Sequence, residues 1–327
     1  MSCSLIDNFD RKHNYLRLSL TDKCNFRCFY CMPEGTVDFS PFKNLMQADE
    51  IFKIVSELVD LGVTKVRFTG GEPLVRKDAK HIISLLSTLP IELAITTNGY
   101  LLDQYIDFFK EIGLSSVNIS LDTLKEDKFK EITKRDFFHK VLDNIKKASE
   151  AGLNVKINTV VMRGINDDEI VDFVQWSNEN DYAIRFIEFM PFNGNKWDWT
   201  RVVKHDEILS LIEQEHIVTR TEDAKNDTSK NFSIEGFKGS FAIISSISKP
   251  FCGSCNRIRL TADGKLKNCL FSSGEKNVLA AFRNGESMSE IFNESLIEKK
   301  AERAGLDFNQ KSGIINADKR SMFSIGG

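Results

Sequence analysis

Residues 15–31 read YLRLSLTDKCNFRCFYC, in which an apolar run is followed closely by three cysteines. The run Leu16–Leu20 predicts a strand, and Cys24, Cys28 and Cys31 begin just beyond its carboxyl end. In sheets of parallel strands, active sites lie at the carboxyl ends of the strands. This stretch therefore predicts both where the sheet begins and at which edge its chemistry lies.

Five further apolar runs follow, separated by stretches with the apolar periodicity of helices that end at glycine or proline. The expected strands are Lys65–Thr69, Glu92–Thr97, Ser116–Leu121, Val155–Val161 and Ala183–Phe189. Strands joined by helical crossovers form a parallel sheet. Six strands are fewer than the eight of a closed barrel, so the pattern predicts an α/β fold, an incomplete (β/α)6 TIM-like barrel, over residues 1–200.

The βα repeat stops after Pro191, and residues 201–327 are expected to form a small C-terminal α+β extension. Ser240–Ser246 and Asn256–Thr261 are predicted to be strands of a small sheet of their own. The last residues, up to Gly326 and Gly327, are expected to form a flexible tail.

A second group of cysteines, Cys252, Cys255 and Cys269, lies in this extension, so six of the seven cysteines fall in two triads. The role of the seventh, Cys3, stays open. An iron–sulfur cluster held by three cysteines keeps one iron free for a ligand that is not protein, whereas tetrahedral zinc requires a fourth ligand. The two triads therefore predict two [4Fe-4S] clusters, each with an open iron.

The bulk composition excludes several classes of protein. The net charge of −3 argues against a nucleic-acid partner, although local arginines can still hold a small anion. No apolar run approaches the ~20 residues of a membrane helix, and the first residues show no basic region followed by an apolar stretch, so no signal peptide is expected. A cytoplasmic protein without membrane association or a disulfide framework is expected.

The first triad, C-x3-C-x2-C with the aromatic Tyr30 before its last cysteine, resembles the signature of the radical S-adenosylmethionine (radical SAM) superfamily. The resemblance implies that this cluster binds SAM and, with one electron from an external reductant, generates a 5′-deoxyadenosyl radical. It also implies SAM contacts from Tyr30, from Gly71 within Gly70-Gly71-Glu72-Pro73, and from Ser120 and Met190 at later strand ends.

The second triad, which begins within C-G-S-C-N-R-I-R at residues 252–259 and has Cys269 beyond it, resembles the GTP 3′,8-cyclase family of molybdenum cofactor biosynthesis. Members convert GTP to 3′,8-cyclo-7,8-dihydroguanosine 5′-triphosphate, which a downstream enzyme rearranges to cyclic pyranopterin. The resemblance implies that the second cluster binds guanine and that the Gly326-Gly327 tail enters the active site. A homodimer is expected. The implied GTP contacts are Arg17, Arg67, Thr96, Lys156, Arg257, Ile258 and Arg259.

The positions of the basic residues agree with an anionic substrate. Arg257 and Arg259 alternate along one predicted strand, so both guanidinium groups point to the same face. Arg17, Arg67 and Lys156 lie in other predicted strands, where a buried cation is costly unless an anion accompanies it. The alternative is that they pair with Glu92 or Glu188. Thr96 and Thr97 cannot be separated without the strand register.

Two other functions stay open at this stage. A radical SAM enzyme that modifies peptides would also carry extra clusters, usually with more C-terminal cysteines, and would have no use for the Arg-Ile-Arg strand. An iron–sulfur electron carrier or redox sensor would tend to close its clusters with four cysteines. Iron analysis distinguishes such iron–sulfur proteins from a zinc protein, because two [4Fe-4S] clusters hold about eight irons per chain and a zinc protein holds none.

Overall fold

The computed structural model describes residues 5–32, 39–309 and 320–326. At its centre six neighbouring strands run parallel, and the six predicted strands are confirmed to within one residue at each end. They are β1 (Tyr15–Ser19), β2 (Lys65–Thr69), β3 (Glu92–Thr97), β4 (Ser116–Ser120), β5 (Val155–Val161) and β6 (Ala183–Glu188). The α/β class with a largely parallel sheet is therefore confirmed.

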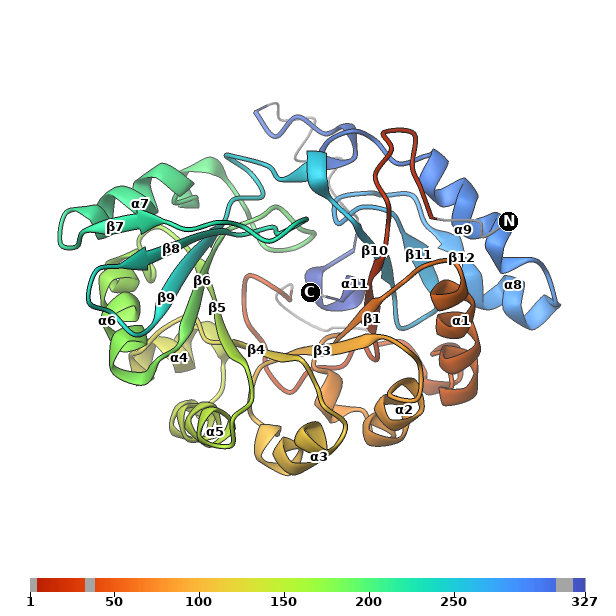
Figure 1. The fold of residues 1–327 in the computed structure, drawn as a ribbon, viewed down its shortest axis with the longest axis horizontal. Helices are drawn as coiled ribbons and strands as arrows, with labels where there is room; N and C mark the ends of the chain where they lie inside the picture. Colours follow the sequence, from red (N-terminus) through yellow and green to blue (C-terminus); the bar gives the residue numbers. More distant parts are fainter. Residues whose placement is uncertain (1–4, 33–38, 310–319, 327) are drawn as a thin grey trace.

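Helices cover the outer side of this curved sheet (Figure 1). The apolar side chains of α1 fall at helical spacing, and Ile51, Ile54, Val55 and Leu58 are all buried against the sheet. The helices of this half are α1 (Ala48–Asp60), α2 (Ala79–Leu86), α3 (Ile106–Glu111), α4 (Glu126–Thr133), α5 (Phe138–Glu150) and α6 (Ile170–Asn180). α4 is a short helix with few apolar residues, so its sequence has too little apolar periodicity to predict it.

The C-terminal strands do not form a sheet of their own, so that expectation was wrong. β9 (Ser240–Ile244) pairs in parallel with β6, and β10 (Arg257–Leu260) pairs in parallel with β1. In the part of the chain that the structure describes, twelve strands form one sheet in the order β12-β11-β10-β1-β2-β3-β4-β5-β6-β9-β8-β7. The physical reason is that the six-stranded sheet leaves unpaired backbone groups at both edges, and β9 and β10 satisfy them.

The remaining elements extend the two ends of the sheet. The strands are β7 (Val218–Arg220), β8 (Lys230–Ile234), β11 (Lys265–Lys267) and β12 (Lys276–Asn277). The helices are α7 (His205–Glu213), α8 (Val278–Asn284), α9 (Met288–Ile297) and α11 (Met322–Ile325). The short 3-10 helices are η1 (Phe42–Asn44), η2 (Pro73–Val75), η3 (Leu102–Gln104), η4 (Asp167–Glu169), η5 (Trp199–Arg201), η6 (Cys252–Ser254) and η7 (Arg303–Gly305).

The main apolar core lies between the sheet and its outer helices. The inner side of the sheet is different, because the C-terminal helix α11 lies inside its curve (Figure 1). Within the described ranges, no helix combines the length and the apolar character needed to span a bilayer.

Candidate functional site

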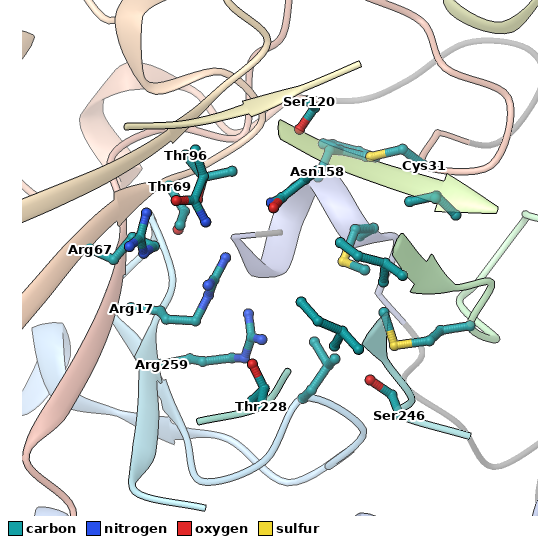
Figure 2. Close-up of a pocket in the computed structure, with 18 of the residues that line it drawn as sticks. Arg17, Cys31, Arg67, Thr69, Thr96, Ser120, Asn158, Thr228, Ser246 and Arg259 are labelled. Carbon is teal, nitrogen blue, oxygen red and sulfur yellow. The ribbon is translucent and has the colours of Figure 1, made fainter. Parts of the chain in front are cut away.

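A cavity of about 330 Å³ lies on the inner side of the sheet and is lined by residues from both halves of the chain. Figure 2 shows arginine side chains from neighbouring strands and Cys31 directed toward the same space. The six triad cysteines are all unbridged and all line this cavity. The two triads, more than two hundred residues apart in sequence, therefore belong to one site; Cys3 lies outside the described residues.

The first triad lies on the loop that follows β1, and the Gly70-Gly71 turn after β2 packs against it. The Gly71 N–H donates to the carbonyl of Thr21 at 2.7 Å, and the Glu72 N–H donates to that of Lys23 at 2.8 Å. A Cβ on Gly71 would lie 2.5 Å from the carbonyl oxygen of Lys23. The close approach of two backbones therefore requires glycine here.

The buried carboxylate of Glu72 fastens this turn to the end of β3. It accepts hydrogen bonds from the Leu74 N–H, the Thr97 hydroxyl and the Asn98 N–H. Burial raises the pKa of Glu72 to about 7. Asn98 also donates to Asn25 in the cysteine loop. Three strand ends are thus tied together around the triad.

The donor set of the first triad fits an iron–sulfur cluster. Burial raises the pKa of Cys24 to about 12 and that of Cys28 well above its usual value, and metal binding would deprotonate such thiols. In the described ranges no three His, Cys, Asp or Glu side chains come close enough to share one metal ion. A cubane does not need them to, because each cysteine binds a different iron.

The second triad receives hydrogen bonds from the residues that follow α9. The Arg303 N–H lies 3.4 Å from Cys252 Sγ, and Lys299 Nζ lies 3.7 Å from Cys255 Sγ. Burial alone would raise the pKa of the Cys255 thiol, but the charge of Lys299, the N–H and charge of Arg257 and the charge of Arg11 together outweigh it, so the pKa lies below its usual value. This triad therefore has a more cationic environment than the first.

Three arginines form one row across the strands at the cavity wall. Arg17 on β1 is in register with Arg259 on β10 and with Arg67 on β2. Burial and the neighbouring Arg259 hold the pKa of Arg17 well below its usual value. Such a row of buried like charges favours an anion in the cavity.

Glu92 and Glu188 were the alternative partners for these arginines, but neither carboxylate neutralises them. Glu92 pairs with Lys65 at 2.7 Å. Glu188 accepts hydrogen bonds from the N–H groups of His205, Ile247 and Ser248 and from the Ser248 hydroxyl. Both acids are therefore engaged elsewhere.

Several polar atoms in the cavity wall are buried and lack a hydrogen-bond partner among the described residues. They are Arg17 Nε, Arg257 Nη1, Thr69 Oγ1, Thr96 Oγ1, Asn118 Oδ1 and Asn158 Oδ1. Buried polar groups are nearly always paired, so an accumulation of unpaired ones indicates the site of a polar ligand. This group contains both donors and acceptors, as a nucleotide would require.

The strand register distinguishes the two threonines of β3. Thr96 lines the cavity with an unpartnered hydroxyl, whereas the hydroxyl of Thr97 donates to Glu72 and accepts from the Gly99 N–H. Both border the cavity, but Thr96 is the one with free hydrogen-bonding capacity.

Most of the predicted site residues line the cavity, and the four exceptions are Ile258, Lys156, Gly326 and Gly327. Ile258 is buried in the core, on the face of β10 opposite to Arg257 and Arg259. Lys156 is not part of the lining, although burial and the charge of Arg185 lower its pKa to about 8. Gly327 lies outside the described residues. Those in the lining are the six cysteines, Tyr30, Gly71, Ser120, Met190, Arg17, Arg67, Thr96, Arg257 and Arg259.

Gly326 packs against the ends of β1 and β2 and reaches the arginine row. Its carbonyl accepts a hydrogen bond from Arg259 at 2.8 Å. Its φ is +76°, and an added Cβ would lie 2.6 Å from Thr69 Oγ1. Gly326 is therefore held beside the cavity by contacts that only glycine allows.

Several polar residues of the lining are not predicted by the sequence patterns, and examples are Tyr15, Asp122, Asn158, Arg185 and Thr228. The Tyr15 hydroxyl accepts a hydrogen bond from Arg67 at 2.6 Å, and the Tyr30 hydroxyl donates to Asp122 at 2.6 Å. Arg185 could have been recognised from the sequence, because it is the one cation in the apolar run of β6, whose only other charged residue is Glu188. Thr228 had none, since its loop carries no recognisable pattern.

Comparisons with known proteins agree with this site. A family model described as the radical SAM superfamily matches residues 18–177, and one described as Molybdenum Cofactor Synthesis C matches residues 182–304. Among solved structures, SuiB of Streptococcus suis is similar with a TM-score of 0.65 at 16% identity, over 94% of this chain and 73% of that chain. At this identity the likeness shows the fold alone.

Curated relatives are much closer in sequence. "GTP 3′,8-cyclase, mitochondrial" of Arabidopsis thaliana is 43% identical over all of this chain and 84% of that protein. "GTP 3′,8-cyclase" of Syntrophomonas wolfei is 42% identical over 99% of this chain and all of that protein. "Molybdenum cofactor biosynthesis protein 1" of Homo sapiens is 44% identical over 93% of this chain, which spans only 49% of that protein. The chain belongs to the GTP 3′,8-cyclase family within the radical SAM superfamily.

Proposed function

We propose that this protein is a radical SAM GTP 3′,8-cyclase that converts GTP to 3′,8-cyclo-7,8-dihydroguanosine 5′-triphosphate, the first step of molybdenum cofactor biosynthesis. The observation that carries the proposal is the cavity wall, where unpaired buried donors and acceptors accompany a row of arginines between two cysteine triads. An anionic, hydrogen-bonding substrate fits that wall. Close relatives bearing the name GTP 3′,8-cyclase support the same reaction.

At the first triad, Cys24, Cys28 and Cys31 would hold a [4Fe-4S] cluster with one open iron, to which SAM would bind. When bound, the cluster and SAM supply a 5′-deoxyadenosyl radical that can abstract hydrogen from C3′ of GTP. The chain's own part is to orient SAM, and Gly71, Ser120 and Met190 border the space for it. Tyr30, fixed by its hydrogen bond to Asp122, would close one side.

At the second triad, Cys252, Cys255 and Cys269 would hold the other [4Fe-4S] cluster, and its open iron would take the guanine. Arg17, Arg257 and Arg259 would bind the nucleotide through charge-assisted hydrogen bonds. Arg67, on the strand next to β1, would hold these arginines in position, and Lys156 would add positive charge at a greater distance from the nucleotide. Thr96 and the backbone of Ile258 would contact the substrate, and the Gly326-Gly327 tail would close the site.

The other parts of the proposal concern architecture and partners. The six parallel strands are proposed to form a partial barrel over residues 1–200, with residues 201–327 as the second-cluster region. An external one-electron reductant and a downstream enzyme that forms cyclic pyranopterin are expected partners. The homodimer and the cytoplasmic location stay predictions from the sequence.

The test is anaerobic reconstitution followed by reaction with SAM and a strong reductant, with and without GTP. We expect about eight irons per chain, and 5′-deoxyadenosine that depends on GTP and matches the cyclised nucleotide in amount. Deoxyadenosine formed regardless of GTP would move the substrate search toward peptides. No deoxyadenosine from a fully iron-loaded sample would favour an electron carrier.

A further inference from the structure

Residues 299–304 lie against the second triad, and none of them has a role in the proposed binding of SAM or GTP. Lys299 follows α9 directly and its side chain is buried, with 4% of the residue exposed. Its Nζ donates to Cys255 Sγ at 3.7 Å and to the Arg257 carbonyl at 3.1 Å. An ammonium group thus lies inside the protein, directed at one cysteine sulfur.

A second donor in the same segment serves another cysteine. The Arg303 N–H lies 3.4 Å from Cys252 Sγ. Arg303 and Ala304 have φ values of +43° and +57°, a left-handed conformation that is uncommon outside glycine. Such backbone strain persists only where the surroundings impose it, and it is often found at functional sites. Here the unusual turn accompanies the N–H contact with sulfur.

Arg11, near the start of the described chain, holds this segment against the triad. Its Nη1 donates to the carbonyls of Cys252 and Ala301, both at 2.7 Å, and its Nη2 donates to that of Lys300 at 2.9 Å. Its Nε pairs with the buried Asp7 at 2.7 Å. One guanidinium therefore joins the triad's backbone to the two residues that follow Lys299.

We propose that Lys299 is a positioning residue that raises the reduction potential of the cluster at Cys252, Cys255 and Cys269, assisted by the Arg303 N–H and held in place by Arg11. The inference rests on the second cluster of the proposed function. A cluster gains one negative charge when it is reduced, so a nearby cation and N–H donors to its sulfurs stabilise the reduced form. Burial strengthens the effect because charges interact more strongly where water is excluded.

The experiment is a redox titration, followed by electron paramagnetic resonance, of the anaerobically reconstituted full chain carrying both clusters. SAM is added to identify the signal of the first cluster, which serves as an internal reference. Lys299→Met is expected to shift the reduction equilibrium of the second cluster about tenfold toward the oxidised form, which is 59 mV for a one-electron couple. Lys299→Arg should restore most of the wild-type potential.

The matched control is Lys300→Met, which removes a charge from the exposed neighbouring residue without removing a donor to sulfur. It should leave both potentials unchanged. A purely structural role of Lys299 would lower the iron content but would not move the potential of the clusters that form.

The outcomes separate this inference from the proposed function. Eight irons per chain with a wild-type potential in Lys299→Met would overturn the inference and leave the two-cluster enzyme intact. Four irons in the wild-type protein would overturn both. If Lys299→Met does not take up the second cluster, Lys299→Gln, which keeps an N–H donor without the charge, is titrated instead, and an unchanged potential there would overturn the inference.

Discussion

Arg17 and Arg67 stand opposite each other on neighbouring strands, yet their guanidinium groups have different surroundings. Arg67 donates to the Tyr15 hydroxyl, the Ile95 carbonyl and the Ser116 hydroxyl, at 2.6, 2.7 and 3.0 Å. Arg17 keeps a buried Nε without a partner. Of the two, Arg67 is built into the wall, whereas Arg17 is available to a ligand.

The same substitution at these two positions should change stability in opposite directions. Arg17→Met should raise the free energy of unfolding of the nucleotide-free protein by about 1–3 kcal/mol, because a buried unsatisfied donor is removed. Arg67→Met should lower it by about 1.5–3 kcal/mol, because hydrogen bonds to a charged group are lost. Denaturant titration measures both, and Arg17→Met should also weaken GTP binding at least tenfold. Destabilisation by Arg17→Met would contradict this reading of the cavity.

The tail glycine can be compared with another glycine of similar conformation. Gly326 and Gly285 have φ values of +76° and +72°, but an added Cβ meets Thr69 at 2.6 Å in the first case and open space in the second. Gly326→Ala should displace the tail and reduce cyclised nucleotide more than tenfold. Gly285→Ala should cost about 1 kcal/mol of stability without loss of product. Equal activities of the two variants in a single-turnover assay would show that the tail's position is unimportant.

At the scale of elements, the site depends on loops that two different strands place against each other. The Gly70-Gly71 turn belongs to β2, while the cysteine loop it touches belongs to β1. The parallel pairing of these strands brings both carboxyl ends to one edge.

Two glycines near the two triads test this packing. Gly71→Ala would place a Cβ 2.5–2.6 Å from two backbone carbonyl oxygens, which cannot move aside as a flexible side chain can. It should therefore prevent assembly of the first cluster and lower the iron content from about eight to about four per chain. Gly253→Ala, between two cysteines of the second triad, adds its Cβ to open space and should keep full iron content. Iron analysis after reconstitution distinguishes the two variants. Eight irons per chain in Gly71→Ala would contradict the prediction that the added Cβ prevents assembly of the first cluster.

At the scale of the whole molecule, charge is distributed unevenly. The chain has a net charge of −3, but its central cavity is lined by Arg17, Arg67, Arg185, Arg257 and Arg259. A cationic cavity in a protein of net negative charge attracts a small anion.

GTP affinity should fall as pH rises through about 8. Burial lowers the pKa of Lys156 to about 8. Burial would raise the pKa of Tyr15, but Arg67, Arg17 and Arg257 outweigh it and bring that pKa to about 8 as well. Above this pH the lysine loses a positive charge and the tyrosine gains a negative one. Both changes weaken anion binding, and a bound anion in turn raises both pKa values, so binding takes up protons.

Calorimetry at pH 7, 8 and 9, in buffers of different ionisation enthalpy, measures both the affinity and the proton uptake. We expect affinity to fall about tenfold from pH 7 to pH 9, which corresponds to about 1.4 kcal/mol. Lys156→Met and Tyr15→Phe should each flatten the profile in part. Lys147→Met, which removes a surface lysine paired with Asp143, should not. A pH-independent affinity would show that the charge of neither group acts on the bound nucleotide.

The sequence by itself determined the six parallel strands, both cysteine triads and the family, because apolar periodicity and ligand spacing are local properties of the chain. It also determined that Arg257 and Arg259 share a face, since side chains alternate along a strand. Only the tertiary structure decided that β9 and β10 complete the edges of one sheet, because the pairing of strands depends on contacts between distant segments. For the same reason it alone separated Thr96 from Thr97, Arg17 from Arg67, and placed Lys299 at a cysteine sulfur: these distinctions depend on which atoms are left unpaired after packing, and no single segment contains that information.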